Sequence, residues 1–122
     1  MRGPLVFKGL RVESNEKEFY FDVTWQGKDQ TLVGQGTGPI DATMHALESI
    51  NLHFHLIEYN QVALDVEHMD FAAYALSEIK LQRKDAAGAQ PKGAISLGRG
   101  KDMDTIKANV RALFNAVNQL LR

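Results

Sequence analysis

The sequence predicts an α+β fold made of two βββα units that are related by a pseudo-twofold axis, with the sheet on one side and the helices on the other. Two Gly-x-Gly segments, Gly34–Gly36 and Gly98–Gly100, each follow an apolar stretch and precede a helical pattern. The same order of three strand-like segments and one helix-like segment occurs twice along the chain, which indicates an internal repeat. Residues 19–25 alternate apolar and polar side chains, and this period of two is the clearest strand signal.

Length and composition limit the possible functions. The 122 residues are enough for one domain, and we predict a single domain over residues 1–122. The net charge is −1 and the basic residues are scattered, which argues against nucleic-acid and membrane-surface partners. The absence of cysteine excludes disulfides and thiolate zinc sites. No apolar stretch is long enough to span a bilayer and the first residues do not resemble a signal peptide, so we expect a cytoplasmic protein.

The first unit extends from about residue 5 to residue 51. Strands are expected over residues 5–12, 19–25 and 31–35, separated by a polar turn over 13–18 and a second turn over 26–29. A helix is expected to begin at Pro39, because the first helical position needs no N–H donor. Ile40, Met44 and Leu47 recur at helical spacing and make this helix amphipathic.

The second unit extends from about residue 53 to residue 122. Strands are expected over residues 53–63, 71–82 and 93–97, with a polar connection over 65–70 and an exposed loop over 84–91. The last helix carries one apolar stripe formed by Ile106, Val110, Leu113, Val117 and Leu120.

The two glycine segments are candidate ligand sites, because the free N–H groups of a helix start can bind an anion. The N–H groups of residues 40–42 and 103–106 would receive a carboxylate, and Asp41 or Asp104 would receive an ammonium group. The competing interpretation is that the glycines only permit a tight corner and close packing, and that both aspartates stabilise their helix. The candidate residues of these turns are Gly36, Thr37, Gly38, Pro39, Ile40 and Asp41 in the first, and Gly100, Asp102, Met103 and Asp104 in the second.

A small apolar pocket is also expected on the paired strands of the second unit. Its candidate residues are Leu56, Tyr59, Ala63, Ala73 and Ala75. The alternative is that these side chains only fill the core, which is the commoner use of such residues.

His53 and His55 lie two residues apart on one predicted strand and could form a metal pair. The sequence nominates no third or fourth ligand for them, so we predict no metal and no cofactor. No nucleophile, phosphate-loop or paired-carboxylate motif is present, and nothing supports catalysis by this chain alone.

The chain resembles the C-terminal regulatory domain of 2-isopropylmalate synthase, which also occurs in citramalate synthase. The segment Gly34–Ala42 is similar to that family's Gly-x-Gly-Asn-Gly-Pro-Val-Asp-Ala motif, with Thr37 in place of asparagine. The segment Asp104–Asn118 is similar to the family's last helix, with Asn109 where serine is usual. Tyr59 and Ala63 fall where the family has a tyrosine and an alanine.

The resemblance implies an allosteric domain that dimerises and binds leucine, the end product, so that a distant catalytic TIM barrel is inhibited. Such a barrel needs about 250 residues and has no room in this chain. The resemblance leaves open isoleucine as the ligand, through a citramalate synthase, and a structural dimerisation module without a ligand. A ligand would place its charged end at the glycine turns and its side chain near Leu56, Tyr59 and Ala63.

Overall fold

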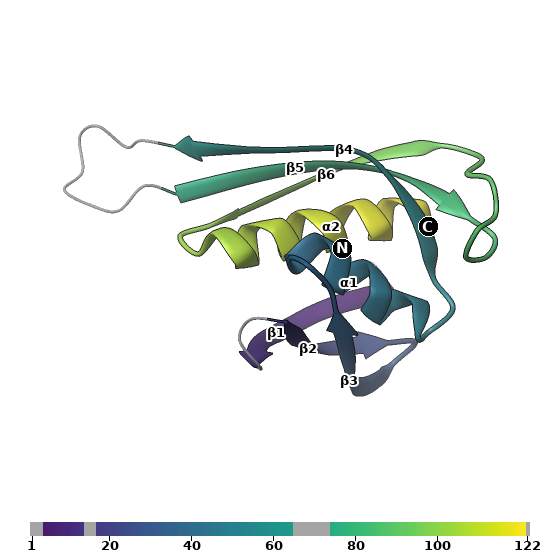
Figure 1. Cartoon of the computed structure of the whole chain (residues 1–122), viewed down its shortest axis with the longest axis horizontal. Coiled ribbons are helices and arrows are strands. Elements are labelled where there is room, and N and C mark those ends of the chain that lie inside the picture. The colour runs from purple at the N-terminus through teal and green to yellow at the C-terminus, as the bar shows by residue number, and fades with distance from the viewer. Residues whose placement is uncertain (1–3, 14–16, 65–73, 122) are drawn as a thin grey trace.

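A computed structural model describes residues 4–13, 17–64 and 74–121 and arranges them in three layers (Figure 1). The element order confirms the predicted α+β class with two βββα units. The first unit contains β1 (Leu5–Glu13), β2 (Glu18–Trp25), β3 (Lys28–Gln35) and α1 (Pro39–Glu48). The second contains β4 (His53–Leu64), β5 (Tyr74–Lys84), β6 (Ile95–Asp102) and α2 (Thr105–Leu121).

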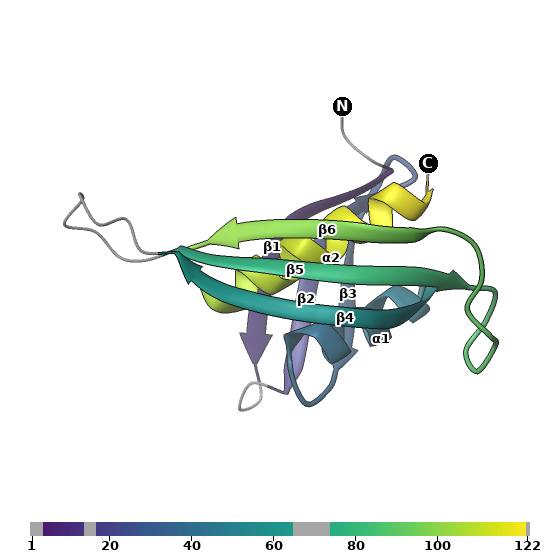
Figure 2. The ribbon, with the colours of Figure 1, turned by 90° about the horizontal axis from the view of Figure 1, so that it is seen from above.

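Each unit forms its own antiparallel sheet, with strand orders β1-β2-β3 and β4-β5-β6. The helices lie between the two sheets (Figure 1), whose strands cross at a steep angle when seen from above (Figure 2). The prediction of a sheet on one side and helices on the other is therefore wrong in its layering. The reason is that α2 also packs on the first sheet: the ring of Phe114 lies 5.2 Å from that of Phe7 and 6.4 Å from that of Phe21.

The first sheet follows its sequence pattern closely. Phe19, Phe21 and Val23 of β2 are buried at alternate positions, as a half-buried strand requires. The turn between β2 and β3 has Gln26 and Gly27 at positive φ, which matches the right-handed twist of the flanking strands. These features place the end of β3 directly before α1.

In the second sheet, β4 and β5 are long strands that pair antiparallel from His53 with Lys84 to Leu64 with Tyr74 (Figure 1). The register shifts between Leu56 and Glu58, which marks a β-bulge in β4. Leu56 pairs with buried Leu81 and Tyr59 pairs with buried Ile79, so both β4 side chains face the helix layer. The bulge thus allows two residues three positions apart to share one face.

β6 is longer than predicted, and Gly98 and Gly100 lie inside this strand rather than in a turn before the helix. The physical reason is close packing against α2. A Cβ on Gly98 would lie 2.2 Å from the carbonyl oxygen of Ala112, and one on Gly100 would lie 2.4 Å from that of Ala108. The packing interpretation holds for these two glycines, which let the helix approach the sheet.

Candidate functional site

The first glycine turn opens onto a pocket of about 480 Å³ at the boundary between the two units. This volume lies in the range of roughly 300–1,000 Å³ that small-molecule sites occupy. The first unit contributes the turn and one face of α1, and the second unit contributes β4 and α2. The lining residues are Thr37, Gly38, Pro39, Ile40, Asp41, Met44, Leu56, Tyr59 and Asn109. Seven candidate residues from two distant segments of the sequence therefore meet in one place.

The start of α1 leaves backbone donors without a partner beside this pocket. Gly38 is the N-cap residue, its backbone is extended, and it has no side chain that could accept from the first turn. In the described part of the chain, the N–H of Ala42 donates to the Gly38 carbonyl, whereas the N–H groups of Ile40 and Asp41 have no acceptor. An N-cap side chain normally accepts a hydrogen bond at these positions. The turn can therefore bind an anionic group.

A carboxylate and an imidazole flank this helix start. Asp41 Oδ2 accepts a hydrogen bond from the Thr37 N–H at 3.3 Å, and Asp41 Oδ1 lies 3.7 Å from His45 Nε2. His45 Nδ1 donates to the carbonyl oxygen of Gln35, at the end of β3. This hydrogen bond, with the negative charges of Asp41 and Glu48, holds the pKa of His45 above its usual value against the opposing effect of desolvation. Asp41 thus supplies a negative charge that can receive an ammonium group.

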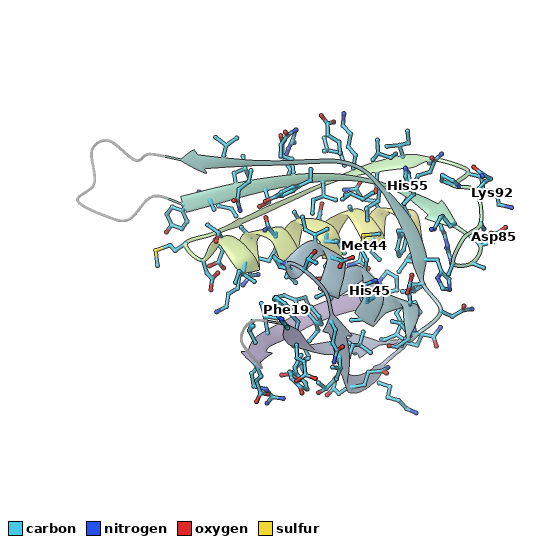
Figure 3. The ribbon with its side chains drawn as sticks, in the orientation of Figure 1. Phe19, Met44, His45, His55, Asp85 and Lys92 are labelled. Atoms are coloured by element: carbon cyan, nitrogen blue, oxygen red, sulfur yellow. The ribbon has the colours of Figure 1, made fainter. Side chains whose placement is uncertain are left out.

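The apolar part of the pocket comes from Ile40, Met44, Leu56 and the ring of Tyr59. Figure 3 shows Met44 and His45 on different sides of α1, with Met44 toward the second sheet. The helical spacing predicts Met44 on the apolar face of α1 but does not predict its contact with the pocket. Its position one helical turn after Ile40 is the signal that could have found it.

Asn109 is the other pocket residue that sequence reasoning missed. The residue is 7% exposed, and its Oδ1 accepts hydrogen bonds from Tyr59, Gln61 and Ser77. The available signal was a polar residue on a buried helix face, three positions after Ile106 and four before Leu113.

The second glycine segment does not contribute to the pocket in the described part of the chain. Asp104 caps α2: its Oδ1 accepts from the N–H groups of Ile106 at 2.8 Å and Lys107 at 3.4 Å. Asp102 Oδ1 accepts from the Asp104 N–H, and its Oδ2 accepts from Arg111. These contacts hold the pKa of Asp102 below its usual value, with the backbone hydrogen bond as the largest cause.

The remaining candidate residues of that segment and of the strands lie elsewhere. Met103 is 62% exposed, and Gly100 faces α2. Gly36 is packed under the first turn, where a Cβ would lie 2.6 Å from Asp41 Oδ2. Ala75 is buried opposite Ala63 in the β4–β5 ladder. Ala73 and the side chain of Ala63 lie outside the described residues.

The histidine pair does not form a recognisable metal centre. His53 lies near the end of α1, with Nε2 3.1 Å from Asn51 Oδ1 and Nδ1 3.9 Å from Glu48. His55 is exposed and pairs with Gln82 across the ladder (Figure 3). Among the residues with described positions, no three histidine or acidic side chains come together as metal ligands. In the same part of the chain, no helix has the length and apolar character needed to cross a membrane.

Known proteins resemble this chain over most of its length. The 2-isopropylmalate synthase of Paraburkholderia phytofirmans is 33% identical over 118 residues, which cover 95% of this chain and 18% of that protein. The synthase of Corynebacterium efficiens is 29% identical over 115 residues, covering 93% of this chain and 18% of that protein. The synthase of Kocuria rhizophila is 32% identical over 113 residues, covering 86% and 16%. The chain thus spans less than a fifth of the length of these relatives.

A family described as the LeuA allosteric (dimerisation) domain matches residues 3–121, almost the whole sequence. The predicted resemblance to the regulatory domain of the synthase is therefore confirmed. This chain belongs to the LeuA allosteric (dimerisation) domain family.

Proposed function

We propose that this chain is a cytoplasmic feedback domain of 2-isopropylmalate synthase and that it binds leucine in the pocket beside the first glycine turn. The observation that carries the proposal is the meeting of free backbone donors, a carboxylate and an apolar wall in one pocket of about 480 Å³. These are the three chemical groups that an α-amino acid with an aliphatic side chain requires. The relatives are named 2-isopropylmalate synthase, which supports the assignment of the chain to that enzyme.

The ligand's carboxylate is proposed to bind at the N–H groups of Ile40 and Asp41, where the helix dipole favours negative charge. Its ammonium group would be placed near the Asp41 carboxylate, since charged partners strengthen a hydrogen bond. The side chain would lie against Met44, Leu56 and Tyr59. Because the two units contribute different walls, a ligand would hold them together.

A homodimer and an attached catalytic barrel complete the proposal. The family's description includes dimerisation, and the second sheet exposes the large apolar side chains Ile57, Val62, Ile95 and Leu97. Surfaces of this kind often become buried in an assembly. Ligand binding that orders such an interface would shift the conformational equilibrium of the attached barrels by a coupling free energy of about 1–3 kcal/mol.

Calorimetric titration of the 122-residue chain with leucine, isoleucine and valine tests the proposal. Leucine is expected to bind saturably and more tightly than the other two. Since it binds the folded state, leucine at about 100 times its dissociation constant should add about 2.7 kcal/mol to the free energy of unfolding. Sedimentation measured with and without leucine reports whether the chain dimerises.

The Gly38→Val variant tests the location of the site. A Cβ on Gly38 would meet no atom within 4 Å, so the valine can be added without a backbone clash. Its side chain would occupy the mouth of the pocket, and leucine affinity should fall at least tenfold, about 1.4 kcal/mol. Gly9→Val is the matched control, because a Cβ there makes only an ordinary 3.6 Å contact with Asp22 and lies outside the pocket lining.

Unchanged affinity in a folded Gly38→Val variant would refute the placement of leucine. Preference for isoleucine would redirect the assignment to a citramalate synthase. If none of the three amino acids gives heat or a thermal shift, the feedback proposal is wrong. A dimer observed in that case would favour a structural dimerisation module.

A further inference from the structure

Asn109 presents a polar group on a face of α2 whose other buried residues are apolar in the described part of the chain. It lies in the first turns of α2, among buried neighbours such as Ala108, Val110 and Ala112. Burial of an amide costs free energy unless its donors and acceptor are satisfied. The donor and acceptor groups of the Asn109 side chain are therefore expected to have hydrogen-bond partners.

The orientation of the Asn109 amide is fixed by its neighbours. The carbonyl oxygen of Thr105 can only accept a hydrogen bond, and Gln61 Nε2 donates to it at 3.4 Å. This contact sets the Gln61 amide, whose Nε2 also lies 3.0 Å from Asn109 Oδ1. The oxygen of Asn109, not its nitrogen, must therefore face Gln61.

The same oxygen accepts two further hydrogen bonds. Ser77 Oγ, fully buried in β5, donates at 2.6 Å, and the Tyr59 hydroxyl donates at 3.1 Å. A carbonyl oxygen has two lone pairs, so three donors at this oxygen leave no accepting capacity for a ligand. In the described part of the chain, the amide nitrogen of Asn109 has no acceptor. Asn109 is also one of the residues that line the pocket.

We propose that Asn109 is a ligand-binding residue whose amide nitrogen donates a hydrogen bond to an oxygen of the bound ligand. Tyr59, Gln61 and Ser77 are the positioning residues that hold its oxygen and turn its nitrogen toward the pocket. The inference rests on the proposed function, because it adds a specificity-determining donor to the same site.

The proposal selects a class of ligand. A donor on this wall favours a ligand that has an oxygen acceptor in reach, which can be its carboxylate or a side-chain oxygen. Valine and threonine distinguish the two, because they have nearly the same shape and differ by a methyl group and a hydroxyl. A bond to the carboxylate affects both amino acids equally. A bond to a side-chain oxygen makes the wild-type chain prefer threonine.

The variant Asn109→Asp tests this contact. Aspartate keeps an oxygen for Tyr59, Gln61 and Ser77 but replaces the donor by an acceptor. Asn115→Asp is the matched control on the same helix. The Asn115 Oδ1 accepts hydrogen bonds from the Arg99 N–H and from Gln119 Nε2, as Asn109 Oδ1 does from its neighbours, and Asn115 lies outside the pocket lining. The control adds the same charge to α2 without touching the site.

The affinity for leucine is expected to fall at least about tenfold in Asn109→Asp and to change less than about twofold in Asn115→Asp. A second measurement does not depend on the variant. In the wild-type chain, the side-chain amide resonances of Asn109, assigned by triple-resonance spectroscopy, should move on saturation with leucine. Those of Asn115 should stay in place.

Leucine binding that is equal in wild type and Asn109→Asp would overturn the contact while the proposed function stands. The same conclusion follows if the Asn109 amide resonances do not move. If the wild-type chain binds leucine, valine and threonine all undetectably, the contact and the proposed function are both wrong. A preference for threonine that disappears in Asn109→Asp supports the contact and assigns it to a side-chain oxygen.

Discussion

At the scale of single residues, His45 connects the pocket to the end of β3. One ring nitrogen donates to the Gln35 carbonyl and the other lies 3.7 Å from Asp41, which lines the pocket. When the imidazole is protonated, it contacts the turn between β3 and α1 on both sides. Its charge also offsets that of Asp41, the proposed partner of the ligand's ammonium group.

A pH titration of the His45 ring by NMR should give a pKa above its usual 6.5, mainly because of the hydrogen bond to Gln35. Since the folded-state pKa is raised, the stabilisation is fully present below about pH 6.5 and is lost as pH rises through the folded pKa. Asp41→Asn should lower this pKa but leave it above 6.5, because the Gln35 contact remains. A titration at or below 6.5 in the wild-type chain would contradict the geometry.

At the scale of elements, the two helix starts look alike in sequence and differ in chemistry. α2 is capped by Asp104, whose carboxylate uses the first free N–H groups. α1 has glycine at the equivalent position, and its donors stay open to the pocket. Replacing Asp104 by alanine should therefore affect the stability of α2 and not ligand binding.

We expect Asp104→Ala to lower the free energy of unfolding by about 1 kcal/mol, as the loss of an N-cap usually does. Chemical denaturation measures this loss, and calorimetry should show unchanged leucine affinity. Asp104→Asn is the control, because an asparagine oxygen can still accept from the Ile106 N–H. If a folded Asp104→Ala variant loses leucine binding, the second glycine segment does contribute to the binding site and this prediction is wrong.

The sequence predicted the elements whose patterns are regular and failed where packing overrides local preference. The alternation in β2 and the proline at the start of α1 predicted those elements correctly. The Gly-x-Gly pattern between an apolar stretch and a helix predicts a turn at Gly98 and Gly100, whereas both lie in β6, where the close approach of α2 requires them. The convergence of Leu56, Tyr59 and the first turn was predicted from the resemblance. The contribution of Asn109 depends on a hydrogen-bond network that no local pattern reveals.

At the scale of the whole molecule, the two units share one buried core. Phe114 of α2 packs on Phe7 and Phe21 of the first sheet. Asn118 of α2 holds both backbone groups of Leu5: its Oδ1 accepts from the Leu5 N–H at 2.9 Å, and its Nδ2 donates to the Leu5 carbonyl at 2.6 Å. A repeat unit alone would expose these surfaces, so the repeat does not imply two independently folding halves.

Urea unfolding should therefore follow a single transition with both units lost together. Trp25, the one tryptophan of the chain, lies in β2 and reports the first unit by fluorescence. Far-UV circular dichroism is weighted to the second unit, because α2 has 17 residues and α1 has 10. Coincident midpoints are the expected result. Asn118→Ala should lower both midpoints together and reduce the free energy of unfolding given by each probe by about 1–3 kcal/mol, since it leaves two Leu5 backbone groups without a partner. If only the dichroism midpoint moves, the units unfold independently, and a pocket shared between them could not transmit binding from one to the other.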